Sequence, residues 1–374
     1  MTRTYLDHNA TSPLRPEARA VMLDVFDNVG NASAINGHGR AAAKYVNEAR
    51  EAVGLAMGVC AQDIIFMGSG TEADNTAIHS AVKNGRRRVL ISGMDHPATF
   101  MAARDMGVAS ESIPVSGAGV TDMAWLKDRL DRWDAADGAP FVSIAAANSE
   151  TGAIQDIETA ADLVHAAGGH ILVDAVQALG KYRWECEADY IAVSAHKIGG
   201  PQGVGALYVS PDAPFHNLIS GGGQERRRRA GTLNTAGIAG FGAAASACEG
   251  SLGHTGELRG RLEAGLRAME PDLFIFSAEA DRLSNTSFFA VPDAASQTLL
   301  MALDLEGVSV STGTACASGK VGASRAVTAM GRLEDAPKGC IRVSLGYTSA
   351  AQDIEAFLNA WAKIRKIKRS EIAA

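Results

Sequence analysis

The sequence lacks long apolar runs, paired cysteines and a strong excess of either charge. No apolar segment approaches the ~20 residues of a membrane-spanning helix, and the N-terminus becomes polar at Asp7, so we expect no membrane span and no secretory signal. Five cysteines without a C-x-x-C pair indicate neither a disulfide framework nor a zinc site, and we expect no metal. The 35 basic and 42 acidic residues give a net charge of −7, which argues against nucleic acid as the main partner. These absences favour a cytoplasmic protein with reduced thiols.

The sequence does contain an alternation of strand-like and helix-like segments. Residues 71–82 and 157–167 have apolar side chains at helical spacing. The strand-like segments are apolar throughout rather than at every second residue, which is typical of a mostly parallel sheet covered on both faces. The predicted strands are residues 64–67, 88–92, 141–147, 171–174, 190–194 and 205–209. We therefore predict an α/β fold.

The pattern changes after about Gly250. A charged helix is predicted at 258–269, and an amphipathic helix at 353–367. Strand-like pieces lie between them at 273–276, 286–290, 308–311 and 341–345. This mixture predicts a second, smaller α+β domain.

Polar residues at the carboxyl ends of the predicted strands are the first candidates for chemistry, because ligands of open parallel sheets bind there. Gly70 lies in a glycine turn that leads into a helix and could hold a phosphate, although such a turn can equally be an ordinary loop. Asp174 ends a strand and could either face a cation or cap a helix. His96 follows another strand and, taken alone, is more often a satisfied loop residue.

Lys197 is the most informative of these residues. It follows the buried strand 190–194 and precedes a glycine-rich turn. A lysine at the end of a buried strand is costly unless it is paired or used chemically, and a desolvated lysine can form a Schiff base with a carbonyl. Together Lys197, Asp174 and the turn at Gly70 provide the amine, carboxylate and phosphate cup that pyridoxal phosphate requires. Their order on successive strand ends favours an enzyme that uses this cofactor.

Seven ordered motifs resemble those of NifS/IscS-like cysteine desulfurases, which are class V aminotransferases of fold type I. The resemblance runs from residue 5 to about 360. It implies a large cofactor-binding domain, 13–250, with a mostly parallel seven-stranded sheet, and a smaller α+β domain formed by 1–12 with 251–374. The motifs are YLDHNATSP (5–13), GTEADN (70–75), VDAVQ (173–177), SAHK (194–197), GGGQE with AGT (221–225 and 230–232), TACASG (314–319) and IRVSLG (341–346).

The resemblance also implies a role for individual residues around pyridoxal 5′-phosphate. Lys197 would hold the cofactor and move the substrate Cα proton, and His96 would stack on the ring as an acid or base. Asp174 would pair with the ring nitrogen, and Gln177 would donate to the ring hydroxyl. The remaining cofactor contacts implied are Gly70, Thr71, Ser149, Ser194 and His196, with Thr232 given by the neighbouring subunit of a homodimer.

Substrate binding is implied for Arg342, which matches the arginine that holds the substrate carboxylate, and for Asn148. Ser149 departs from the family pattern, because an asparagine is usual there, so we expect weaker carboxylate binding. The basic run 226–229 is unusual as well. We interpret it as a solvated loop, with docking of an acidic partner as the alternative.

Cys316 is the residue that defines the reaction implied. Glycine, serine and threonine surround it, which is typical of a mobile loop, whereas a lone cysteine is more commonly buried and structural. Its thiolate would attack the sulfur of L-cysteine, release L-alanine and keep the sulfur as a persulfide for an acceptor or iron–sulfur scaffold protein, most plausibly in iron–sulfur cluster assembly. The alternatives are a selenocysteine lyase, an aminotransferase, or a degenerate scaffolding subunit. We interpret the remaining cysteines as structural: Cys60, Cys186, Cys248 and Cys340.

Overall fold

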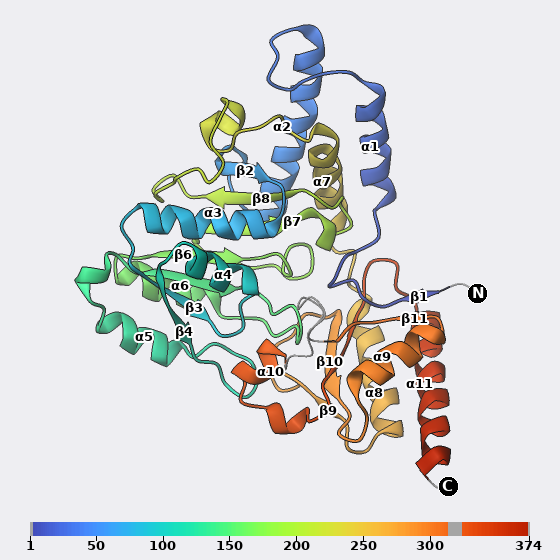
Figure 1. Ribbon diagram of the computed structural model, residues 1–374. Coiled ribbons are helices and arrows are strands. Elements are labelled where there is room, and N and C mark those ends of the chain that lie inside the picture. The colour runs from blue at the N-terminus through green and yellow to red at the C-terminus, as the bar shows by residue number, and fades with distance from the viewer. Residues whose placement is uncertain (1–2, 313–323, 373–374) are drawn as a thin grey trace.

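A seven-stranded sheet forms the centre of the larger part of the molecule (Figure 1). The computed structural model describes residues 3–312 and 324–372, with side chains through residue 366. The strand order is β2-β8-β7-β6-β5-β3-β4, and β8 runs antiparallel to both of its neighbours while the other pairs are parallel. The strands are β2 (Ile64–Met67), β3 (Arg88–Ser92), β4 (Ala109–Ile113), β5 (Phe141–Ala145), β6 (His170–Asp174), β7 (Tyr190–Ser194) and β8 (Gly205–Val209).

Helices cover both faces of this sheet because its central strands carry apolar side chains on both sides. On one face, α3 and α4 pack against residues such as Ile65 and Leu172. On the other face, α2, α5, α6 and α7 pack against residues such as Phe66 and Val173. The helices of this part are α1 (Pro16–Asp27), α2 (Gly37–Met57), α3 (Gly70–Lys83), α4 (Pro97–Asp105), α5 (Met123–Asp131), α6 (Ile157–Ala166) and α7 (Thr235–Cys248), with short helices η1 (Ala61–Asp63), η2 (Ala135–Asp137), η3 (Ala195–Lys197) and η4 (Gln224–Arg227).

The C-terminal part is built on small sheets with helices packed against them (Figure 1). Strand β10 lies between β9 and β12, antiparallel to both, and β1 pairs in parallel with β11. The strands are β1 (Thr4–Tyr5), β9 (Phe274–Ile275), β10 (Thr286–Ala290), β11 (Val308–Ser309) and β12 (Ile341–Ser344). The helices are α8 (Thr255–Met269), α9 (Ser296–Leu305), α10 (Arg325–Ala329), η5 (Leu333–Asp335) and α11 (Ala351–Ile372).

The N-terminal segment joins the core of this C-terminal part. Leu6 is fully buried in one apolar cluster with Leu262, Phe289 and Trp361. This packing agrees with grouping residues 1–12 with 251–374, but the domain boundaries themselves stay a prediction. Among the helices that the structure describes, none is long and apolar enough to cross a membrane.

Most sequence-predicted elements occur within one to three residues of their predicted bounds, and the differences occur at element ends. The strand predicted at 141–147 ends at Ala145, and the one predicted at 308–311 ends at Ser309. In the described residues that directly follow Ser309, 310–312, Ser311 forms an isolated bridge with Arg342, and after Ala145 an isolated bridge joins Ala147 to Ile154. Beyond both strand ends the continuous ladder therefore gives way to isolated bridges.

Candidate active site

The candidate site lies where β2, β6 and β7 end and the N-terminal segment crosses them. Ser69 caps α3, and its Oγ accepts from Glu72 N at 3.1 Å, which sets the start of the helix at Gly70. A Cβ added to Gly70 would lie 2.7 Å from Val176 Cγ2 and 3.5 Å from Ser194 Cβ. The start of α3 thus approaches the ends of β6 and β7 so closely that only glycine fits there.

Lys197 ends η3 directly after strand β7. Its Nζ donates to the backbone oxygens of Asn9 at 2.6 Å and Ala10 at 2.9 Å. The oxygen of Asn9 also accepts from Gln177 Nε2 at 2.9 Å. The buried Asn9 therefore contacts both Lys197 and Gln177, which follow the ends of two different strands.

Asp174 and His96 form the second half of this centre. Asp174 is buried at the end of β6, and its Oδ1 accepts from Val176 N at 2.9 Å. Burial raises the pKa of this carboxyl, and the charges of His96 and Lys197 oppose the rise. His96 caps α4 with Nδ1 accepting from Ala98 N at 3.2 Å, so a neutral ring carries its proton on Nε2. Burial lowers the pKa of His96 and favours that neutral form.

The predicted phosphate contacts differ in burial and in the elements that carry them. Ser194 is buried at the end of β7, and Thr71 is exposed at the second position of α3. His196 lies in η3 with Nδ1 3.2 Å from Thr11 Oγ1, and burial together with the charge of Lys197 lowers its pKa to about 4. Thr232 is exposed in the loop between η4 and α7.

Arg342 reaches the centre from β12 in the C-terminal part. It is buried, its Nη2 pairs with Asp7 Oδ1 at 2.7 Å, and its Nη1 donates to Ser149 O at 3.0 Å. Within the described part of the chain its Nε has no hydrogen-bond partner. A buried guanidinium with a donor to spare is suited to a carboxylate ligand.

The side chain of Asn148 forms hydrogen bonds with the backbone of its own loop and of the segment after β3. Its Nδ2 donates to Met94 O at 2.8 Å, and its Oδ1 accepts from Glu150 N at 2.9 Å and Thr151 N at 2.8 Å. Ser149 meets the site through its backbone oxygen, which also accepts from Asn9 Nδ2 at 3.3 Å. The predicted side-chain roles of Asn148 and Ser149 in ligand binding stay predictions.

Cys316 lies outside the described residues. The other cysteines occupy different environments: Cys248 and Cys340 are buried, whereas Cys60 is exposed. Burial raises the pKa of the Cys186 thiol to about 12, so it is not a thiolate at neutral pH.

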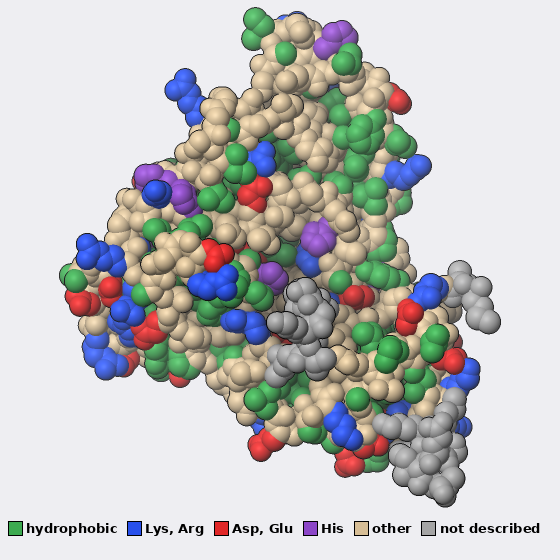
Figure 2. Space-filling model, viewed as in Figure 1, with side chains coloured by type: hydrophobic (Ala, Val, Ile, Leu, Met, Phe, Trp, Pro, Cys, Tyr) green, Lys and Arg blue, Asp and Glu red, His purple; other side chains and the backbone are tan. Residues whose placement is uncertain are grey.

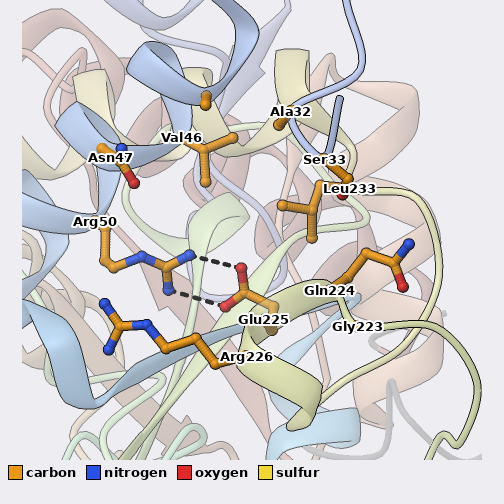
Figure 3. A pocket seen from close by; sticks show the side chains of 11 residues that line it. Ala32, Ser33, Val46, Asn47, Arg50, Gly223, Gln224, Glu225, Arg226 and Leu233 are labelled. Atoms are coloured by element: carbon orange, nitrogen blue, oxygen red, sulfur yellow. Dashed lines mark hydrogen bonds and ion pairs between the residues drawn. The ribbon is translucent and has the colours of Figure 1, made fainter. Parts of the chain in front are cut away.

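A cavity of about 490 Å³ lies away from Lys197, between α2 and the loop around η4 (Figure 3). At its floor Glu225 is buried and accepts from Arg50 at 2.6 and 2.8 Å. The basic run beside it is only partly solvated, because Arg228 donates to Gln62 O and Arg229 pairs with Glu72 at 2.9 Å. Arg226 and Arg227 remain exposed.

Three residues near Lys197 had no role assigned from the sequence. Asp7 pairs with Arg342, Asn9 accepts from Lys197, and Lys181 donates to Gln177. Asp7 and Asn9 lie inside the motif 5–13, and Lys181 follows Gln177 by four residues. These positions are the only signals that the sequence offers for the three residues. They do not predict the contacts of Lys181 with Asn9 or of Asp7 with Arg342, which join segments 172 and 335 residues apart.

The residues present fit pyridoxal phosphate. A lysine amine, a buried carboxyl and a neutral imidazole are brought into one electrostatically coupled group, as the effects of Lys197 and His96 on Asp174 indicate. The close approach at Gly70 leaves backbone at the start of a helix facing this group, which is the arrangement that binds phosphate. The spare donor of Arg342 is available for the carboxylate of a substrate.

Comparison with known proteins places the chain in a family. The family model for class V aminotransferases, whose members depend on pyridoxal phosphate, matches residues 4–357. The chain is 40% identical over 370 residues to a cysteine desulfurase of Cereibacter sphaeroides, which covers 96% of this chain and 94% of that protein. It is 34% identical to the cysteine desulfurase IscS of Clostridium botulinum, covering 98% and 95%.

A solved structure agrees with these sequence matches. The NifS-like protein of Rickettsia africae superimposes with a TM-score of 0.89 at 30% identity, over 97% of this chain and 99% of that one. The fold type I architecture predicted from the sequence is therefore confirmed. The chain belongs to the class V aminotransferase family, among its NifS/IscS-like cysteine desulfurases.

Proposed function

We propose that this chain binds pyridoxal 5′-phosphate and converts L-cysteine to L-alanine, leaving the sulfur on Cys316. The observation that carries the proposal is the meeting of Lys197 Nζ and Gln177 Nε2 on the backbone oxygen of Asn9, with the buried Asp174 at the end of the neighbouring strand β6. When bound there, the cofactor would supply an electron sink for charge at the substrate Cα.

The cofactor would be held by residues from several elements. Asp174 would face the ring nitrogen, Gln177 the ring hydroxyl, and His96 the ring face. Since burial disfavours the charge of the Asp174 carboxyl, a protonated ring nitrogen beside it would offset this cost and favour the ionised carboxylate. The phosphate would be held by Gly70, Thr71, Ser194 and His196, with Thr232 from a second copy of the chain.

In the proposed reaction, Arg342 orients the substrate through its carboxylate, and Lys197 Nζ takes the proton from Cα. The thiolate of Cys316 then attacks the substrate Sγ. A new S–S bond forms as the Cβ–Sγ bond breaks, its electron pair passes to the carbon fragment, and protonation of that fragment gives alanine. The sulfur stays on Cys316 as a persulfide.

A homodimer is part of the proposal, because the family resemblance assigns Thr232, which is exposed, to the phosphate of the neighbouring subunit. Exposed apolar side chains support it: Phe26, Val29 and Ile35 lie in and after α1, next to Ala32 and Ser33, which line the cavity in Figure 3. Figure 2 shows hydrophobic side chains along the α1 face. An exposed apolar surface of this kind is typical of an association site.

The persulfide would pass to an acceptor or scaffold protein, and we propose iron–sulfur cluster assembly as its use. A thiol that must remain reduced between turnovers requires a reducing compartment, which supports a cytoplasmic location.

The substitution Cys316→Ser tests the proposal. The variant should still bind the cofactor and L-cysteine but lose sulfide release, because a hydroxyl cannot accept sulfur. Mass spectrometry after incubation with L-cysteine should find one added sulfur on Cys316 of the wild type and none on the variant. Lys197→Ala is the complementary control and should remove the cofactor absorbance near ~400–420 nm. Sulfide release by Cys316→Ser at the wild-type rate would contradict the proposed nucleophile.

A further inference from the structure

A second lysine lies beside Lys197 and has no place in the proposed chemistry. Lys181 follows β6, and its Nζ donates to Gln177 Oε1 at 2.6 Å and to Asn9 Oδ1 at 3.1 Å. Both acceptors are neutral amide oxygens, and within residues 3–312 and 324–366 no carboxylate forms an ion pair with this amine. Burial lowers the pKa of Lys181 well below its ordinary value, and the charges of Lys197 and Arg342 lower it further. Burying a lysine amine without a carboxylate partner destabilises the fold, so its presence here indicates a functional requirement.

The contact with Lys181 determines how the Gln177 amide is turned. An amide nitrogen cannot accept a hydrogen bond, so a donating amine must face Oε1. Nε2 is thereby turned to the other side, where it donates to Asn9 O at 2.9 Å. The same oxygen accepts from Lys197 Nζ at 2.6 Å. Lys181, Gln177 and Lys197 are therefore linked through one asparagine.

We propose that Lys181 is a positioning residue that keeps the nitrogen end of the Gln177 amide facing the reaction centre. This inference rests on the proposed function, in which Gln177 donates to the ring hydroxyl of the cofactor. Without Lys181 the amide is able to turn by half a rotation and present its oxygen instead. The donor would then be lost although Gln177 itself is intact.

A double-mutant cycle between Lys181 and Gln177 tests this inference. The dissociation constant of pyridoxal phosphate is measured by absorbance titration of the full-length chain after cofactor removal. Lys181→Met should weaken binding by about tenfold in the wild-type background, and by less than about twofold in the Gln177→Ala background. Lys181→Arg, which keeps the donor, should recover most of the affinity. Lys44→Met, which removes an exposed lysine of α2, is the matched control and should change nothing.

Equal weakening in both backgrounds, or no weakening at all, overturns the inference, because a lysine that only stabilises the fold has no coupling to Gln177. Circular dichroism and thermal melting establish that each variant folds. If Lys181→Met does not fold, the same cycle is run with Lys181→Leu and judged by the same coupling. A wild-type chain that binds no pyridoxal phosphate would instead contradict the proposed function on which the inference depends.

Discussion

At the scale of single residues, the centre is notable for buried ionisable groups that lack ion-pair partners. Asp74 of α3 is buried beneath the site, and in the described residues its Oδ1 has no hydrogen-bond partner. Burial raises the pKa of Asp74 well above its ordinary value, and the charges of Asp174 and Asp95 add to the rise. The carboxyl is therefore neutral in the folded protein under conditions in which it ionises in the unfolded chain.

This difference predicts a stability that falls as pH rises. Because the folded state retains a proton that the unfolded chain releases above its ordinary pKa of 3.8, the contribution of Asp74 is fully present below that pH and is lost as pH rises toward the folded pKa. Asp74→Asn should raise the free energy of unfolding at pH 8 by about 1 kcal/mol or more and flatten its pH dependence. Urea denaturation at several pH values between about 4 and 9 measures both effects. The exposed Asp105→Asn is the control, and equal curves for Asp74→Asn and wild type would refute this assignment.

At the scale of elements, η4 carries the most strained backbone in the described chain. Glu225, Arg226 and Arg227 have φ values of 45°, 55° and 67°, so three successive non-glycine residues are left-handed. Glu225 is fixed by Arg50 and by Phe66 N at 2.9 Å, while Arg226 and Arg228 both donate to Gln62 O. Tertiary contacts thus impose a backbone that the local sequence disfavours.

Arg227→Gly should relieve part of this strain. Arg227 is exposed and left-handed, so glycine should raise the free energy of unfolding by about 1 kcal/mol. Arg228→Gly is the matched comparison, because Arg228 has a φ of −86° and donates to Gln62 O, and it should lower stability instead. Thermal melting of the two variants gives the sign of each change. A lower melting temperature for Arg227→Gly would contradict this prediction. It would mean that the Arg227 side chain stabilises the fold by more than its left-handed backbone destabilises it.

Some of the helices and strands could be predicted from the sequence and others could not. Apolar runs gave β2, β3, β7 and β8 with their observed bounds, because burial on both faces leaves a continuous signal. Strand β4 was not predicted: it is an edge strand, ASESI, whose residues are mostly exposed. Helix α7 was not predicted either, since its glycines and alanines give little periodicity, although it is buried almost throughout.

The candidate site was predictable as a set of residues but not as a set of contacts. Lys197, Asp174 and His96 carry recognisable chemistry at strand ends. Asn9 and Lys181 do not, because an asparagine or a lysine becomes informative only when the fold brings it to the site. Asn9 lies 188 residues from Lys197 and 172 from Lys181 in the chain.

At the scale of the whole molecule, the apolar side chains after α1 predict how two copies associate. Ile35 is 94% exposed, and Phe26 lies nearby in the chain. Ile35→Asp should shift the chain toward monomers, because association would bury the new charge without a partner. Analytical ultracentrifugation measures the mass. Leu305→Asp alters an apolar residue at the end of α9 that is 86% exposed, and it should leave the mass unchanged. A wild-type chain that sediments as a monomer would refute the dimer.

The hydrogen bond from Asn9 N to Ser344 Oγ, at 2.9 Å, has a consequence for biosynthesis. Asn9 is synthesised 335 residues before Ser344. The sheet that carries Lys197 can assemble while translation continues. The strand that orders Asn9, and with it the partner of the Lys197 amine, becomes available only after residue 344 has been synthesised, so a nascent chain that stops earlier lacks this contact at its reaction centre.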